Sequence, residues 1–134
     1  MRAAQAISIV DDDDPVRDSM RLLLETFGYS VREYATPAAL LDDPQARECS
    51  CLILDLHMPG MSGLELVEQL RSEGFEAPAL LVTGRRDATL EQRLSRAAIL
   101  TTLQKPVSEG VLIEWVTRAC AATGPAPGYA QVPT

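Results

Sequence analysis

The sequence predicts a single α/β domain, an open sheet of five parallel strands with helices on both faces. Two observations lead to this fold class. Short apolar segments alternate strictly with segments of helical periodicity, five of each, along the 134 residues, and this alternation is typical of a parallel sheet covered on both faces. Two strand-like segments, residues 51–54 and 79–82, are apolar without interruption, which indicates strands buried on both sides.

The first strand and helix are expected within residues 6–28. The apolar run at residues 6–10 ends at a series of aspartates and predicts a strand. Pro15 then fits the first turn of a helix, where the N–H that proline lacks would have no helical partner. Apolar residues recur at helical spacing through residues 16–27, and Gly28 stands where a helix commonly ends.

The next elements lead to the expected centre of the sheet. Residues 29–34 predict a second strand that is less buried, because its apolar residues have polar neighbours. Thr36 precedes a proline and begins a short helix that closes near Pro44. Residues 51–54 form the continuous apolar run of the third strand, which ends at Asp55.

The same alternation continues in the second half of the chain. An apolar stripe at residues 64–70 predicts a helix that stops at Gly74, and residues 79–82 predict the fourth strand. Residues 85–98 have helical propensity, but few of them besides alanine are apolar. We therefore expect a weakly anchored helix that faces solvent.

The last strand and helix complete the expected domain. Residues 99–103 predict a strand that is shorter and more polar than the others, and residues 107–122 predict an amphipathic helix. Glycine and proline then become frequent, as in loops. We expect the domain to span residues 1–122, with residues 123–134 forming a flexible tail or the start of a linker.

Composition narrows the possible functions. Acidic residues outnumber basic ones 19 to 12, and the net charge is −7; this argues against direct nucleic-acid binding, which needs lysine and arginine. No apolar run approaches the roughly 20 residues that span a bilayer, and the N-terminus lacks the apolar stretch of a signal peptide. The three cysteines lack zinc-ligand spacing. We expect a cytoplasmic domain without a membrane partner.

Residues with chemical function stand at the ends of four of the five expected strands. In a parallel sheet these ends share one edge, where ligands bind. The first strand contributes Asp11 and Asp12, the third Asp55, the fourth Thr83, and the fifth Lys105, which is the single lysine of the chain. Residues far apart in sequence are thus expected to converge at one edge.

This combination predicts a metal-assisted phosphoryl site. Clustered carboxylates repel one another unless a cation joins them, and an all-oxygen ligand set favours a hard divalent ion, Mg²⁺ or Mn²⁺. A carboxylate beside such an ion can attack phosphorus and form an aspartyl phosphate. Lys105 would supply positive charge and Thr83 a hydrogen-bond donor for the phosphoryl oxygens.

The sequence closely resembles the receiver domain of bacterial two-component response regulators, which has the CheY-like, flavodoxin-like fold. The resemblance covers residues 6 to about 121 and implies the strand order 2-1-3-4-5. It is greatest for the branch typified by FixJ, whose members often carry a C-terminal DNA-binding domain. The matching segments are Ile9-Val10-Asp11-Asp12 with Val16-Arg17, residues 54–63, Val82-Thr83-Gly84 and Gln104-Lys105-Pro106.

The resemblance also implies a role for each residue at the edge. Asp55 would accept a phosphoryl group from a sensor histidine kinase, Thr83 would be the switch hydroxyl, and Lys105 its cationic partner. The Lys105–Pro106 bond would be cis, which X–Pro bonds tolerate best. The expected Mg²⁺ ligands are three carboxylates and one backbone carbonyl, from Asp11, Asp12, Asp55 and His57.

The chain departs from the family pattern at two places. Thr102 stands where the family usually has an aromatic residue that changes rotamer on activation, and Ala98-Ile99 replaces the usual Gly-Ala. We therefore expect the output to depend on a different rearrangement. The side chains of Arg85 and His57 occupy positions that border the phosphoryl group in the family, and they are candidates for tuning its lifetime.

Other functions agree less well with the residues. A hydrolase of the haloacid-dehalogenase type would share the aspartyl nucleophile, but Pro15 stands where threonine or valine is expected, and no cap domain is present. An EF-hand at Asp11–Asp14 fails because Val16 occupies the position that needs glycine. A receiver that binds partners without being phosphorylated remains a third alternative.

The sequence allows two alternatives for the output. The residues after the predicted last helix are too few for a helix-turn-helix. The chain is expected to be either a free-standing receiver that acts on an unknown downstream protein, or the truncated N-terminal part of a FixJ-type transcriptional regulator. A homodimer is possible.

Overall fold

The computed structural model describes residues 5–121 and contains one sheet of five parallel strands. Their order is β2-β1-β3-β4-β5, so the predicted fold class and strand order are confirmed. The strands are β1 (Ala6–Val10), β2 (Ser30–Tyr34), β3 (Cys51–Asp55), β4 (Ala79–Thr83) and β5 (Ile99–Gln104).

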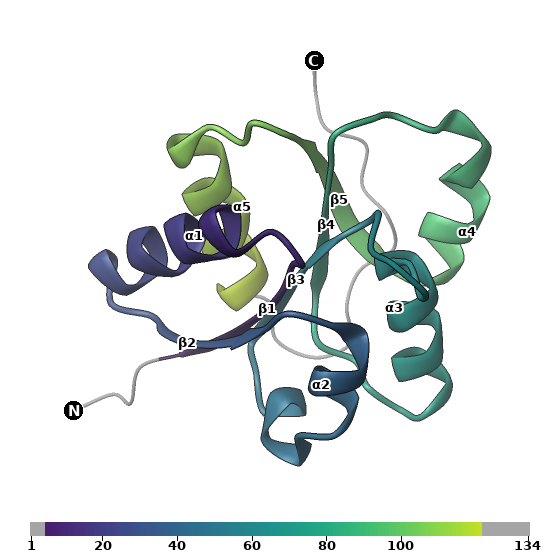
Figure 1. Ribbon diagram of the computed structural model, residues 1–134, viewed down its shortest axis with the longest axis horizontal. Helices are drawn as coiled ribbons and strands as arrows, with labels where there is room; N and C mark the ends of the chain where they lie inside the picture. Colours follow the sequence, from purple (N-terminus) through teal and green to yellow (C-terminus); the bar gives the residue numbers. More distant parts are fainter. Residues whose placement is uncertain (1–4, 122–134) are drawn as a thin grey trace.

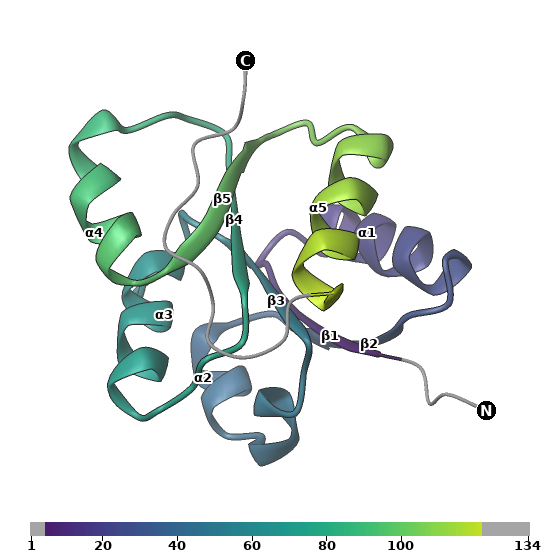
Figure 2. The same cartoon turned by 180° about the vertical axis from the view of Figure 1, so that it is seen from behind.

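Helices cover both faces of this sheet (Figures 1 and 2). On one face lie α1 (Asp14–Thr26) and α5 (Glu109–Ala121). The other face carries α2 (Pro37–Leu41), α3 (Gly63–Ser72) and α4 (Glu91–Arg96). Each face has its own apolar core, one packed against α1 and α5 and the other against α2, α3 and α4. No helix within residues 5–121 combines the length and apolarity that crossing a membrane requires.

The central strands are buried as their composition predicts. Every residue of β3 and β4 is buried, because helices cover both of their faces. β2 lies at the edge of the sheet and is partly exposed, in agreement with its alternating sequence. Polar residues cap the helices locally: Asp13 caps α1, Thr36 caps α2, and Ser62 forms a capping box with Glu65 at α3.

Three expectations about element bounds need correction. The helix expected at residues 85–98 is a 3-10 turn, Ala88–Leu90, followed by the six-residue α4, which buries only Leu94. The short helix expected between Thr36 and Pro44 is confirmed as α2, and an unexpected 3-10 turn follows it at Pro44–Arg47. β5, with six residues, is the longest strand rather than the shortest. Helix α5 begins at Glu109, two residues later than expected, because Ser108 accepts a hydrogen bond from the N–H of Val111. The tail expected at residues 123–134 lies outside the described residues.

Candidate functional site

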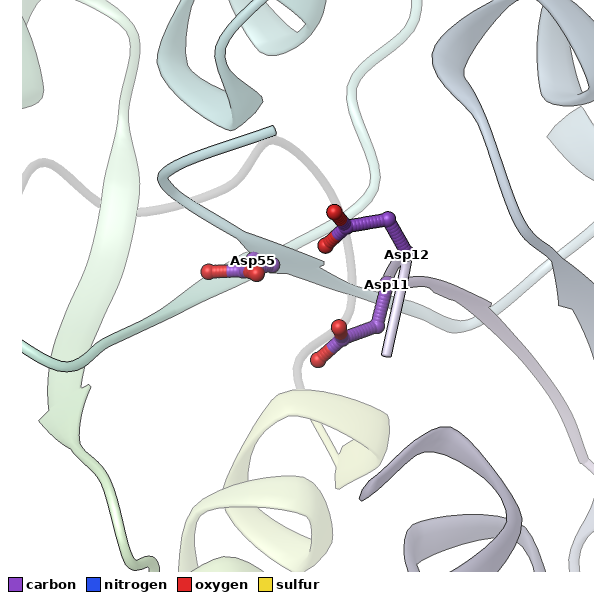
Figure 3. Close-up of side chains that lie close together, drawn as sticks. All are labelled: Asp11, Asp12 and Asp55. Atoms are coloured by element: carbon purple, nitrogen blue, oxygen red, sulfur yellow. The ribbon is translucent and has the colours of Figure 1, made fainter. Parts of the chain in front are cut away.

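Three carboxylates meet at the C-terminal edge of the sheet. Asp11 and Asp12 follow β1 directly, and Asp55 is the last residue of β3. One oxygen from each lies within 4.8 Å of the others, and Figure 3 shows the three side chains gathered on the same side of the strand ends. Asp11 is fully buried, Asp55 is 7% exposed, and Asp12 is exposed. The predicted convergence of these three residues is confirmed.

Lys105 joins two of these carboxylates from the end of β5. Its Nζ lies 3.2 Å from Oδ2 of Asp11 and 3.3 Å from Oδ2 of Asp55. Burial alone would lower the pKa of Lys105, but the hydrogen bonds and charges of the two aspartates raise that pKa above its ordinary value. Lys105 is therefore a cationic partner of the buried pair Asp11 and Asp55.

Asp55 lies in surroundings that disfavour its ionised form. Burial, and next the negative charge of Asp11, raise the pKa of Asp55 above its ordinary value, although Lys105 and a hydrogen bond from the N–H of His57 act in the opposite direction. That N–H lies 3.2 Å from Oδ1 of Asp55, while the His57 side chain is exposed. One lysine therefore leaves the charge of the carboxylates only partly compensated.

The donor set fits a hard divalent cation. All three side chains offer carboxylate oxygens, close enough together to share one ion. A cation there would relieve the repulsion that raises the pKa of Asp55. Because Asp12 is exposed, the ion would be reached from solvent. The site can therefore hold a metal.

Thr83 is buried at the end of β4, and its hydroxyl is occupied locally. Oγ1 donates a hydrogen bond to the carbonyl of Arg85 at 2.7 Å and accepts one from the N–H of Arg85 at 3.1 Å. The N–H of Lys105 donates to the carbonyl of Thr83 at 2.7 Å, which keeps the two strand ends in register. The Arg85 side chain is exposed. The bond between Lys105 and Pro106 is cis, as the resemblance implied.

The two departures from the family pattern are visible in the backbone and in the core. Thr102 lies half-buried on β5, and its hydroxyl, like that of Thr101, is buried without a hydrogen-bond partner within residues 5–121. Ala98 has a φ of +55°, a conformation that glycine adopts more easily. Alanine therefore occupies a turn whose geometry suits the glycine of the family.

Sequence reasoning missed the need for glycine at position 63. A Cβ on Gly63 would lie 2.3 Å from the carbonyl oxygen of Asp55 and 3.2 Å from Leu81. The N–H of Gly63 donates to the carbonyl of Leu56 at 2.9 Å, so α3 begins in contact with the end of β3. A glycine at the first position of a helix, directly after a site loop, is the signal that could have indicated this close approach.

Comparison with known proteins identifies the family of this sequence. The sequence matches the family described as the response regulator receiver domain over residues 7–117. It is 34% identical to the transcriptional regulatory protein FixJ of Azorhizobium caulinodans over 107 residues, which are 80% of this chain and 51% of that protein. It is 35% identical to the C4-dicarboxylate transport transcriptional regulatory protein DctR of Rhodobacter capsulatus over 118 residues, 87% of this chain and 60% of that protein. The chain thus spans about half the length of the curated relatives it matches.

A solved structure is similar across nearly the whole domain. The crystal structure of FixJ-N superposes with a TM-score of 0.79 at 31% identity and covers 92% of this chain and 98% of that one. Its strands and helices therefore correspond to those that place the three carboxylates and Lys105 at one edge. On the combined evidence of motif, fold and sequence similarity, this chain belongs to the CheY-like receiver domains of two-component response regulators, a family of signalling domains.

Proposed function

We propose that this receiver accepts a phosphoryl group on Asp55 from the phosphohistidine of a sensor histidine kinase, in a reaction that requires Mg²⁺ or Mn²⁺. The observation that carries the proposal is the cluster of Asp11, Asp12 and Asp55, within 4.8 Å of one another, with Lys105 in contact with two of them. Burying a charged network costs free energy of folding, so its presence at one edge of the sheet favours a functional role.

In the proposed reaction, a carboxylate oxygen of Asp55 forms a bond to phosphorus as the P–N bond of the donor breaks, and the leaving imidazole takes up a proton. Lys105 stabilises the negative charge on the phosphoryl oxygens. The metal would be held by Asp11, Asp12, Asp55 and the carbonyl of His57, and it would supply further positive charge. Hydrolysis of the acyl phosphate by the domain itself would end the signal.

The signal would leave the site through Thr83. If this hydroxyl moves to a phosphoryl oxygen, it gives up the hydrogen bond that it donates to the carbonyl of Arg85. The loop after β4 then loses an anchor, and α4, with Leu94 as its single buried residue, can shift. Because Thr102 replaces the usual aromatic residue, the change at the surface would come from this loop and helix.

The side chains of Arg85 and His57 are exposed, on the loops that follow β4 and β3. We propose that they tune the lifetime of the acyl phosphate by restricting the attacking water.

The free cysteines, two of which are buried, favour a reducing, cytoplasmic location. The signal would pass to a downstream protein or, because relatives such as FixJ are transcriptional regulatory proteins, to an output domain. A homodimer is an alternative active form.

Acetyl phosphate tests the proposal without knowledge of the kinase. With Mg²⁺ present, the intact mass is expected to rise by one phosphoryl group, and both a chelator and Asp55→Asn are expected to abolish that rise. Absence of any gain in the wild type would favour a receiver that binds partners without phosphorylation. A gain that persists in Asp55→Asn would assign a different nucleophile.

A further inference from the structure

Arg17, in the first turns of α1, contacts the loop that carries two of the site's carboxylates. Its Nη1 donates to the backbone carbonyl of Asp11 at 2.6 Å, and its Nη2 donates to Oδ1 of Asp14 at 2.7 Å. Its Nε forms an ion pair with Glu33 of β2 at 3.4 Å. The Arg17 side chain is only 15% exposed. One side chain therefore connects both ends of the acidic loop to the neighbouring strand.

The four consecutive aspartates divide into two groups. Asp13 caps α1 by accepting the N–H of Val16, and its own N–H donates to Oδ1 of Asp11 at 2.9 Å. Asp14 pairs with Arg17. The carboxylates of Asp13 and Asp14 thus have partners on α1, whereas those of Asp11 and Asp12 belong to the cluster at the edge of the sheet.

We propose that Arg17 is a positioning residue for the metal site: it fixes the backbone between Asp11 and Asp14 and so determines where the carboxylates of Asp11 and Asp12 lie. The inference rests on the proposed metal-dependent function. Groups that hold metal ligands in place from outside commonly govern metal affinity. Arg17 is suited to this role because its planar group binds a carbonyl and a carboxylate at once.

Removing Arg17 should change metal affinity in opposite directions depending on whether the residue acts by positioning the ligands or only through its charge. Arg17 is a cation close to a cation site, and its removal would also leave Asp14 without its partner. By Coulomb's law alone, both changes would make metal binding tighter. If Arg17 acts by positioning, its removal weakens metal binding instead, because the loop that presents the ligands loses its anchor.

Arg21 provides a matched control one helical turn later. It forms ion pairs with Glu33 at 2.9 Å, with Glu25 at 2.8 Å, and with Asp18. Both arginines thus lie on α1 and contact Glu33, but the contact with the Asp11 carbonyl belongs to Arg17. Arg21→Ala removes a similar charge and a similar pair without releasing the loop.

The experiment is a titration with Mn²⁺, followed by the paramagnetic resonance signal of the free ion, without any phosphoryl donor. Arg17→Ala is expected to bind Mn²⁺ about tenfold more weakly than the wild type, and Arg21→Ala is expected to bind as the wild type does. Arg17→Lys keeps the charge, but its donors all lie on one nitrogen and cannot reproduce the fork that reaches Asp11 and Asp14 together, so its affinity should lie between those of the wild type and Arg17→Ala. If Arg17→Ala does not fold, Arg17→Lys carries the test, and weaker binding is again expected. The loss of Mn²⁺ affinity in Arg17→Ala should persist at high ionic strength, where Coulomb effects between separated charges are screened.

Two kinds of failure can be told apart. The role of Arg17 alone is overturned if Asp12→Asn loses its affinity for Mn²⁺ but Arg17→Ala binds the ion as tightly as the wild type or more tightly. If Arg17→Ala does not fold, the same result with Arg17→Lys overturns it. If the wild type does not bind Mn²⁺, or if Asp12→Asn binds it equally well, the proposed metal site fails and the inference fails with it.

Discussion

At the scale of single residues, the surroundings of Asp55 disfavour the ionised form of its carboxyl group. Burial and the charge of Asp11 raise its pKa, so the folded state binds the proton on this carboxylate more tightly than the unfolded chain does. The tighter binding of this proton stabilises the folded state fully below the ordinary pKa of 3.8. That stabilisation is lost as the pH rises through the raised pKa of Asp55 in the folded state. At neutral pH the ionised Asp55 therefore destabilises the metal-free fold.

The raised pKa of Asp55 implies that removing the charge of this residue stabilises the metal-free protein at neutral pH. In the absence of divalent metal, Asp55→Asn is expected to have a higher free energy of unfolding than the wild type at neutral pH. The difference should shrink as pH falls toward 3.8, because the wild-type carboxyl is then neutral as well. Urea denaturation of both proteins across this range measures it. A less stable Asp55→Asn at neutral pH would mean that the ion pair with Lys105 outweighs the cost of burial.

Ala98 is a second residue under strain. Its φ of +55° brings the Cβ of an L-residue too close to its own backbone, at a cost of about 1 kcal/mol. Ala98→Gly is therefore expected to raise the free energy of unfolding by up to about 1 kcal/mol. Ala97→Gly is the control: Ala97 is buried with a φ of −80°, and this variant should lose about 1 kcal/mol. Thermal unfolding separates the two, and a loss in both variants would contradict the role assigned to φ at position 98.

At the scale of elements, the start of α3 is fixed by its contact with the end of β3. Gly63→Ala would place a methyl group 2.3 Å from the carbonyl oxygen of Asp55, which is backbone and cannot rotate away. The variant is expected to lose about 2–3 kcal/mol of stability through overpacking, as measured by denaturation. In Gly110→Ala, the new methyl would meet nothing closer than the Ser108 hydroxyl at 3.9 Å, so this control should gain up to about 1 kcal/mol in a helix. Equal stability of Gly63→Ala and the wild type would show that α3 is free to move away from the site.

The existence and order of the elements could be predicted from sequence, because apolar periodicity and strand-end acids are local signals. The bounds of α4 could not. Residues 85–87 have helical propensity, but Thr83 binds the backbone of Arg85, and α4 begins only after the turn that Asp87 caps. A hydrogen bond of this kind depends on the conformation of one side chain, which periodicity does not report.

Side-chain contacts between distant elements could not be predicted from the sequence either. Arg71 of α3 donates to the carbonyls of Phe75, Ala77, Ala97 and Ala98, and so connects α3 to the turn before β5. In the sequence Arg71 is one surface-type residue of an amphipathic helix. The convergence of Asp11, Asp55 and Lys105 was predictable for the opposite reason: parallel topology alone brings strand ends to one edge, whatever the side-chain conformations.

At the scale of the whole molecule, the excess of acid is distributed unevenly. On the surface, arginines pair with acids: Arg21, Arg47, Arg93 and Arg118 each contact at least one carboxylate. At the edge of the sheet three carboxylates cluster, and one lysine contacts two of them. The net charge of −7 therefore includes a local concentration of uncompensated charge, and ligation of a divalent ion would relieve it where it is greatest.

Metal binding should consequently stabilise the whole fold. A ligand that binds only the folded state raises the free energy of unfolding by about 2.7 kcal/mol at a concentration of 100 times its Kd. We expect Mg²⁺ to produce a rise of this size in the wild type, and a chelator to reverse it. Asp12→Asn is the control, because Asp12 is exposed and its loss should remove the metal effect without disturbing the core. Denaturation curves with MgCl₂, compared with NaCl at equal ionic strength, give the measurement. An equal rise in Asp12→Asn would mean that Mg²⁺ acts by screening the acidic surface rather than by binding between Asp11, Asp12 and Asp55.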